Sequence, residues 1–150
     1  ISPQTSYQIL SILRGAIERG TGKSLNSIQY PIAGKTGTTN DSKDLWFFGL
    51  TPKFVVGVYV GYDNPKKIGY RETGSSVALP IFKSFMQAYL QENTDKNIDF
   101  FIPDNIILKK IDPLTGIFET KNSSIIEYFT KDQLETINNL NKVNNIGGIN

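Results

Sequence analysis

Apolar residues recur at helical spacing near the start of the chain and again after residue 76. Ser2 and Pro3 stand where a helix N-cap and a first helical residue belong, and Gly20 stands where a C-terminal cap belongs. We therefore predict one helix between Ser2 and Gly20, and a second helix that Ser75 or Ser76 caps. The first helix is predicted to bury Ile9, Leu10, Leu13, Ala16 and Ile17. The second is predicted to bury Ile81, Phe82, Phe85, Ala88 and Tyr89.

Between the two helices the pattern changes to short runs bounded by turn residues. Residues 33–39, 45–50 and 54–62 are predicted strands, and the last of them is rich in β-branched and aromatic residues. Residues 40–43 and 51–53 have the composition of turns. Short connections between consecutive strands indicate an antiparallel meander. The predicted fold class is α+β, an antiparallel sheet flanked by helices.

The character of the chain changes after residue 91, which suggests two parts, residues 1–91 and a linker with a small C-terminal extension at 92–150. The elements predicted in the second part are a polar linker at 92–99, a short strand at 106–111, a turn at 112–116, a helix at 131–140 and a frayed polar tail at 144–150.

Composition excludes several kinds of chemistry. The 150 residues contain no cysteine and no histidine, which removes disulfides, thiol catalysis, histidine or thiolate metal sites and Ser-His-Asp triads from this chain. We expect no metal and no cofactor. The net charge of +2 gives no support to a nucleic-acid partner, and no apolar run is long enough to span a membrane.

The candidate chemistry lies at Lys35, Thr36, Gly37 and Thr38, with Thr39 directly after them. On a strand, Lys35 and Gly37 face one side and the two threonines face the other. Two hydroxyls spaced in this way can hold one carboxylate, and the lysine adds positive charge. A free backbone N–H on an edge strand can also stabilise an oxyanion.

Two other interpretations of this stretch stay open on the residues alone. One is a turn-rich edge strand with a solvated lysine, since a tripeptide of common residues arises by chance in about 3% of chains of this length. The other is a phosphate-binding loop, because Gly34, Lys35 and Thr36 match the end of a Walker sequence. That motif needs a glycine where this chain has Gln29, and no strand precedes it.

A succession of motifs is more specific than the tripeptide. In chain order they are Arg19-Gly20-Thr21-Gly22, Lys35-Thr36-Gly37-Thr38, Asp44-Leu45-Trp46-Phe47-Phe48-Gly49, Val56-Gly57-Val58-Tyr59-Val60-Gly61, Glu72-Thr73-Gly74 and Ala78-Leu79-Pro80-Ile81-Phe82. Over residues 1–90 this succession resembles the C-terminal half of the transpeptidase domain of class A, bifunctional penicillin-binding proteins. The segment Asp112-Pro113-Leu114-Thr115-Gly116 resembles the stretch located after that domain in the same family.

The resemblance implies a role in peptidoglycan cross-linking, in which a serine of a Ser-x-x-Lys motif attacks a stem peptide and β-lactams mimic the donor. Lys35 would support proton transfer and the charge of the cleft, and the Thr38 N–H would be an oxyanion donor. Thr36 and Thr38 would hold the donor carboxylate, Gly37 would keep the strand open, and Thr39 would border the cleft. The loop at Thr73 and Gly74 is also expected to border it. The side chains of Trp46, Phe47 and Phe48 are expected in the core or in the cleft wall, with the core favoured, rather than in chemistry.

The reacting groups of that family are missing from this sequence, because no serine has a lysine three positions later; Ser11, for example, is followed by Arg14. Ser24 and Asn26 have the Ser-x-Asn form, but we interpret that match as chance. The chain is therefore expected to be an inactive portion of a longer extracytoplasmic transpeptidase with an upstream glycosyltransferase domain and membrane anchor. Its expected partners are the missing N-terminal half of the domain, stem peptides and β-lactams. The alternative is a non-catalytic remnant or binding module of that fold.

Overall fold

The computed structural model describes residues 1–93 and 98–146, with side chains described up to residue 139. Contacts divide the chain into two compact units. Residues 12–101 form one unit, and residues 1–11 together with 102–150 form the other. We call them the sheet unit and the hairpin unit and describe each by itself. The division into 1–91 and 92–150 made from the sequence stays a prediction.

The first predicted helix is confirmed as α1, Pro3–Glu18. The Ser2 hydroxyl accepts a hydrogen bond from the Thr5 N–H at 3.1 Å, which is the contact expected of an N-cap. Ile17 is buried as predicted, whereas Ile9 is 46% exposed and its predicted burial is wrong. Tyr7 is buried in its place and packs edge-on against Tyr128, at 5.0 Å between ring centroids, within the hairpin unit.

A short 3-10 helix, Lys23–Ser27, follows α1 in a stretch predicted to be a loop. It buries Leu25, which is 1% exposed. The helix begins directly after Gly22, whose N–H donates to the carbonyl oxygen of Ala16 at 3.0 Å. The chain is therefore held tightly against the last turn of α1 before it enters the sheet.

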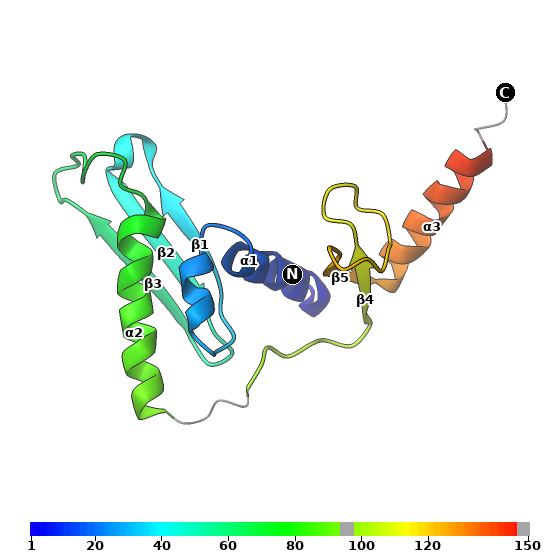
Figure 1. Cartoon of the computed structure of the whole chain (residues 1–150), viewed down its shortest axis with the longest axis horizontal. Coiled ribbons are helices and arrows are strands. Elements are labelled where there is room, and N and C mark those ends of the chain that lie inside the picture. The colour runs from blue at the N-terminus through cyan, green and yellow to red at the C-terminus, as the bar shows by residue number, and fades with distance from the viewer. Residues whose placement is uncertain (94–97, 147–150) are drawn as a thin grey trace. The chain divides into compact units, whose positions relative to one another are not determined.

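The three predicted strands form the predicted antiparallel meander. They are β1, Ala33–Thr38; β2, Asp44–Leu50; and β3, Val55–Gly61, in the order β1-β2-β3. Figure 1 shows them side by side in the sheet unit. The turn between β1 and β2 contains Asp41 and Ser42 in the left-handed region, at φ values of 63° and 53°. Turn-forming residues at 40–43 thus place β1 and β2 in register.

The second predicted helix is present but begins differently. A single π-helical turn, Gly74–Ala78, leads directly into α2, Leu79–Glu92. The N-cap is Thr73, so the prediction of Ser75 or Ser76 as the cap is wrong. Ser76 instead completes a capping box, because its hydroxyl accepts from the Thr73 N–H at 2.9 Å while its own N–H donates to the Thr73 hydroxyl.

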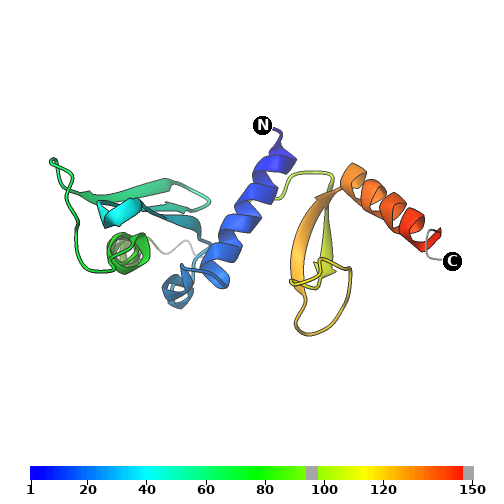
Figure 2. The ribbon, with the colours of Figure 1, turned by 90° about the horizontal axis from the view of Figure 1, so that it is seen from above.

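Helix α2 covers one face of the sheet, as Figure 2 shows in a view along the helix. Its fully buried residues are Leu79, Phe82 and Met86. The Phe82 ring lies 4.9 Å from that of Phe47, and a Cβ added at Gly49 would overlap the Phe82 ring. The absence of a side chain at Gly49 therefore lets the Phe82 ring pack directly on the strand.

The predicted buried face of α2 is largely wrong. Phe82 is buried and Tyr89 is half-buried, but Ile81 is 50% exposed, Phe85 is 45% exposed and Ala88 is exposed. The apolar residues of this helix cover more than one side, so their pattern did not define which stripe meets the sheet. The buried core of the sheet unit contains Ile17, Leu25, Ile28, Tyr30, Ile32, Phe47, Ala78, Leu79, Phe82 and Met86.

The hairpin unit contains β4, Ile106–Ile111, paired antiparallel with β5, Ile125–Thr130, and followed by α3, Lys131–Ile146. The predicted strand at 106–111 and the turn after it are confirmed, because Gly116 N–H donates to the Asp112 carbonyl at 2.8 Å. Strand β5 was not predicted. Helix α3 continues beyond the predicted residue 140, so the predicted frayed tail is wrong for 144–146, and residues 147–150 lie outside the described part.

Among the described residues, no helix combines the length and the apolar character that a membrane crossing requires.

Candidate functional site

The Lys35–Thr38 stretch lies on β1, which has a strand partner on one side only within the described part of the chain. In the register of β1 and β2, Lys35 stands opposite Phe48 and Thr36 stands opposite Phe47. Since alternate residues face opposite sides, Thr36 and Thr38 share the face that α2 covers, and Lys35 and Gly37 share the other face. The predicted alternation along this strand is confirmed.

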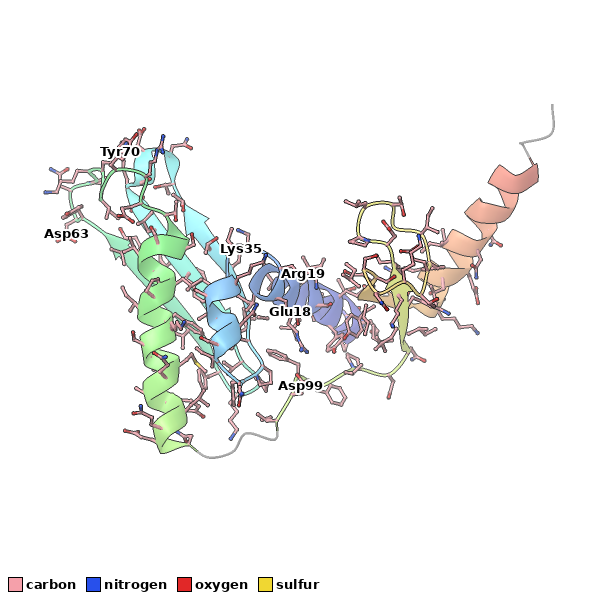
Figure 3. The ribbon with its side chains drawn as sticks, viewed as in Figure 1. Glu18, Arg19, Lys35, Asp63, Tyr70 and Asp99 are labelled. Atoms are coloured by element: carbon pink, nitrogen blue, oxygen red, sulfur yellow. The ribbon has the colours of Figure 1, made fainter. Side chains whose placement is uncertain are left out.

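The Lys35 side chain is exposed, and Figure 3 labels it beside β1. Its Nζ donates to the carbonyl oxygen of Thr36 at 2.9 Å. The ammonium group therefore lies at the edge of the strand, although its Cβ and the threonine side chains leave from opposite faces. The edge is the place where the charge and the hydroxyls can act on one ligand.

Backbone groups of β1 also point to this edge. The Thr39 N–H donates to the Asp44 carbonyl oxygen at 3.0 Å, so it points toward β2. Successive N–H groups of a strand point in opposite directions, and the Thr38 N–H is therefore directed away from β2. It has the orientation that an oxyanion donor on an edge strand requires.

Both threonine hydroxyls have a polar neighbour from a distant part of the sequence. The Thr38 hydroxyl oxygen accepts a hydrogen bond from the Gly74 N–H at 3.0 Å. The Thr36 hydroxyl lies 3.2 Å from the hydroxyl of Thr21, and either of the two can be the donor. Gly74 thus contacts the candidate site, and the expected place of the Thr73–Gly74 loop at the border of a cleft stays a prediction.

Thr39 has a different environment. Its hydroxyl accepts from the Asp44 N–H at 2.9 Å and donates to the Asp44 carboxylate at 3.3 Å. The other carboxylate oxygen of Asp44 accepts from the Tyr59 hydroxyl at 2.8 Å. This hydrogen bond raises the pKa of the Tyr59 phenol above its usual value, because it stabilises the protonated form. The Thr39 hydroxyl is thus engaged within the β1–β2 turn.

The face of the sheet opposite α2 carries an aromatic cluster formed by Trp46, Phe48 and Tyr59. The Trp46 ring lies 5.4 Å from that of Phe48, with the planes nearly parallel, and 4.6 Å from that of Tyr59. Phe48 and Tyr59 are 47% and 48% exposed, so the core position favoured for Phe48 is wrong, and the cleft wall stays a prediction for it. Phe47 is fully buried, as expected, and Trp46 is half-buried.

The described residues hold no group of acidic side chains that could bind a metal ion. A surface cavity of about 490 Å³ is lined by Ser27, Ile28, Gln29, Gln87, Leu90 and Gln91. A second, of about 410 Å³, is lined by Gln8, Phe129, Asp132, Gln133, Thr136 and Ile137. Neither includes any of the predicted site residues, which form an open wall at the strand edge.

Comparison with known proteins identifies the family of the chain. A model described as the penicillin-binding protein transpeptidase domain matches residues 1–87. The chain belongs to the penicillin-binding protein transpeptidase family. The family predicted from the motifs is therefore confirmed, and so is the α+β class.

Individual members of the family agree. Penicillin-binding protein 1A of Rickettsia conorii is 46% identical over 141 residues, 94% of this chain and 18% of that protein. Penicillin-binding protein 1A of Pseudomonas aeruginosa is 42% identical over 117 residues, 77% of this chain and 14% of that protein. The crystal structure of penicillin-binding protein 1A from Haemophilus influenzae superposes with a TM-score of 0.74 at 34% identity, over 87% of this chain and 21% of that one.

The chain thus spans less than a fifth of the length of those two curated relatives. The lysine and the threonines of the wall were predicted from local motifs, and the resemblance placed the Thr73–Gly74 loop near them, but the contacts of Thr21, Asp44 and Tyr59 were not predicted. Asp44 and Tyr59 become neighbours only through the pairing of β2 with β3, and Thr21 and Gly74 reach the wall only through the fold. The Gly-Thr-Gly motif was the signal that could have identified Thr21.

Proposed function

We propose that this chain supplies one wall of the active site of a serine-type D,D-transpeptidase that cross-links peptidoglycan stem peptides. The observation that carries the proposal is the edge position of Lys35 to Thr38, with the Thr38 N–H directed away from β2. The family match supports the same reaction class.

Each group on the wall has a role that its chemistry permits. Thr36 and Thr38 hold the terminal carboxylate of the donor peptide through their hydroxyls, which can donate to anionic oxygen. The Thr38 N–H stabilises the oxyanion that forms when the donor carbonyl is attacked. Lys35 supplies positive charge at the strand edge and supports proton transfer. Gly37 leaves the strand surface open to the peptide, and Thr39 borders the cleft by fixing the turn.

The nucleophile comes from elsewhere in this proposal, since residues 1–150 contain no Ser-x-x-Lys motif. The exposed aromatic cluster supports the idea that another part of the protein packs against this face of the sheet. Phe48, Tyr59 and Val55 are about half or more exposed on the face opposite α2, and a patch of this kind on a soluble domain usually marks a contact surface. We assign this face to the remaining part of a transpeptidase domain, which carries the serine and its lysine.

We place the reaction outside the cytoplasm, where peptidoglycan is cross-linked, with stem peptides as substrates and β-lactams as inhibitors. A glycosyltransferase domain and a membrane anchor on the same protein belong to the proposal as well.

A second candidate function rests on the missing nucleophile. A chain that keeps the carboxylate-binding threonines without Ser-x-x-Lys can bind stem-peptide ends without turnover. The two candidates differ in whether the gene product forms a covalent adduct with a β-lactam.

The proposal is tested with the full-length gene product that contains residues 1–150. Labelling by a fluorescent penicillin should be saturable, and Lys35→Ala should slow it on the order of 10²-fold, because a group that supports proton transfer is lost. The exposed Lys53, also on the sheet unit, provides the matched control as Lys53→Ala, for which the labelling rate should not change. Equal rates for Lys35→Ala and the unmodified protein would remove Lys35 from the mechanism.

A further inference from the structure

Two motifs singled out in the sequence, Gly20-Thr21-Gly22 and Thr73-Gly74, have no role in the chemistry described so far. The structure brings both motifs to β1, where Thr21 contacts the Thr36 hydroxyl and Gly74 contacts the Thr38 hydroxyl. We propose that Thr21 and Gly74 are positioning residues that orient the hydroxyls of Thr36 and Thr38 as donors to a carboxylate. This inference rests on the proposed function, in which those hydroxyls hold the donor carboxylate.

The Thr38 side has the simpler geometry. A threonine hydroxyl has one proton and two lone pairs. The Gly74 N–H occupies one lone pair of Thr38 at 3.0 Å, so the hydroxyl proton must point elsewhere. Since Thr38 is exposed, that proton is available to a ligand at the strand edge.

The segment that carries Gly74 lies very close to the backbone of the sheet. A Cβ added at Gly74 would overlap the carbonyl oxygen of Trp46 and lie 2.7 Å from that of Gly37. Both obstacles are backbone atoms of the sheet, so no rotamer change could relieve them. Only glycine fits, and the capping box of Thr73 and Ser76 fixes the turn from which its N–H donates. The turn is π-helical, a form of helix that is frequent at functional sites.

The Thr36 side uses the Gly-Thr-Gly segment. A Cβ added at Gly20 would lie 2.8 Å from the Ala16 carbonyl oxygen, and one at Gly22 would lie 3.1 Å from the Ile17 Cα. The two glycines therefore let the chain wrap closely around the end of α1 and deliver the Thr21 hydroxyl to within 3.2 Å of Thr36. When Thr21 donates, the Thr36 proton is free for the carboxylate.

Each threonine hydroxyl then donates a hydrogen bond to the ligand and accepts one, Thr36 from Thr21 and Thr38 from Gly74. Successive hydrogen bonds polarise one another, which strengthens the outer one. A hydroxyl without such a donor behind it could instead turn its proton away from the carboxylate. The two motifs thus select the orientation that an anionic ligand needs.

The kinetic test uses the full-length gene product, benzylpenicillin and benzylpenicillin methyl ester, which lacks the charged carboxylate. Thr21→Val removes the hydroxyl at nearly constant shape, and it should slow acylation by the acid about three- to tenfold. Acylation by the ester should change little, and Thr21→Ser should restore the rate with the acid. Equal slowing with both compounds would indicate a merely structural role and overturn the proposal, as would an unchanged rate with the acid.

If the gene product forms no adduct, the proposed function is refuted and the kinetic test cannot be used. A measurement on the 150-residue chain then tests the role of Gly74 directly. Amide hydrogen exchange of Gly74 should accelerate in Thr38→Val and stay slow in Thr38→Ser, because only the valine removes the acceptor. Unchanged exchange in Thr38→Val would overturn the role of Gly74 whether or not the gene product reacts with penicillin.

Discussion

Replacing Phe82 by alanine tests which side of α2 holds the sheet unit together. Phe82 is fully buried against Phe47 and Gly49, whereas Phe85 on the same helix is 45% exposed and makes a looser ring contact with Phe54 at 6.1 Å. Removing a buried phenylalanine costs about 3–5 kcal/mol through lost burial and the cavity that remains. Phe85→Ala loses two loose ring contacts, with Phe54 and Tyr89, and should cost about 1–2 kcal/mol.

The assay is urea unfolding of the 150-residue chain. Trp46 is its one tryptophan and lies on β2, so its fluorescence reports the sheet unit. We expect Phe82→Ala to lower the unfolding midpoint much more than Phe85→Ala, with the slope against urea unchanged. If Phe85→Ala costs as much as Phe82→Ala, the face of α2 that packs on the sheet has been assigned wrongly.

Three further predictions concern local contacts. The Tyr59 phenol should titrate by NMR above the usual tyrosine pKa, and Asp44→Asn should lower this pKa because it removes the carboxylate acceptor. The stability that the Tyr59–Asp44 hydrogen bond contributes is present below the usual tyrosine pKa and is lost as pH rises through the raised value. The Asp112 carboxyl should titrate by carbon NMR below the usual aspartate pKa, because the Thr115 and Leu114 N–H groups stabilise its charged form. The stability linked to Asp112 is present above the usual aspartate pKa and lost as pH falls through the lowered value, and an ordinary titration at either residue would contradict the corresponding hydrogen bonds. Thr73→Ala should destabilise the sheet unit by about 1 kcal/mol in urea, since it removes an N-cap, and an unchanged midpoint would show that the cap contributes nothing.

Local signals in the sequence were sufficient for much of the fold. The Ser2 cap and the turn residues at 40–43 act over a few residues, and both appear as predicted. The buried face of α2 was misjudged because apolar residues surround much of that helix, and the stripe that packs on the sheet, Leu79, Phe82 and Met86, became visible only in the folded chain. Strand β5 was missed although its residues, Ile125–Thr130, are β-branched or aromatic at five of six positions, as is typical of strands; its pairing with β4 across the connection at 112–124 is not specified locally.

The candidate site divides in the same way. Lys35, Thr36 and Thr38 are adjacent in sequence, and the alternation of a strand was enough to place them on two faces. Thr21 precedes its partner by 15 residues, and Gly74 follows its partner by 36. The family resemblance placed the loop of Gly74 near the cleft, but no local pattern specifies contacts of that range, so the hydrogen bonds to the two threonines became visible only in the folded chain.

The central claim is that this chain forms the lysine- and threonine-bearing wall of a penicillin-reactive site whose nucleophile lies elsewhere. Intact-mass measurement after incubation with benzylpenicillin tests it most directly, on the 150-residue chain and on the full-length gene product side by side. We predict no adduct on the chain alone and one penicilloyl group per molecule of the gene product, on a serine outside residues 1–150. A stoichiometric adduct on a serine within these residues, or no adduct on either protein, would contradict the account.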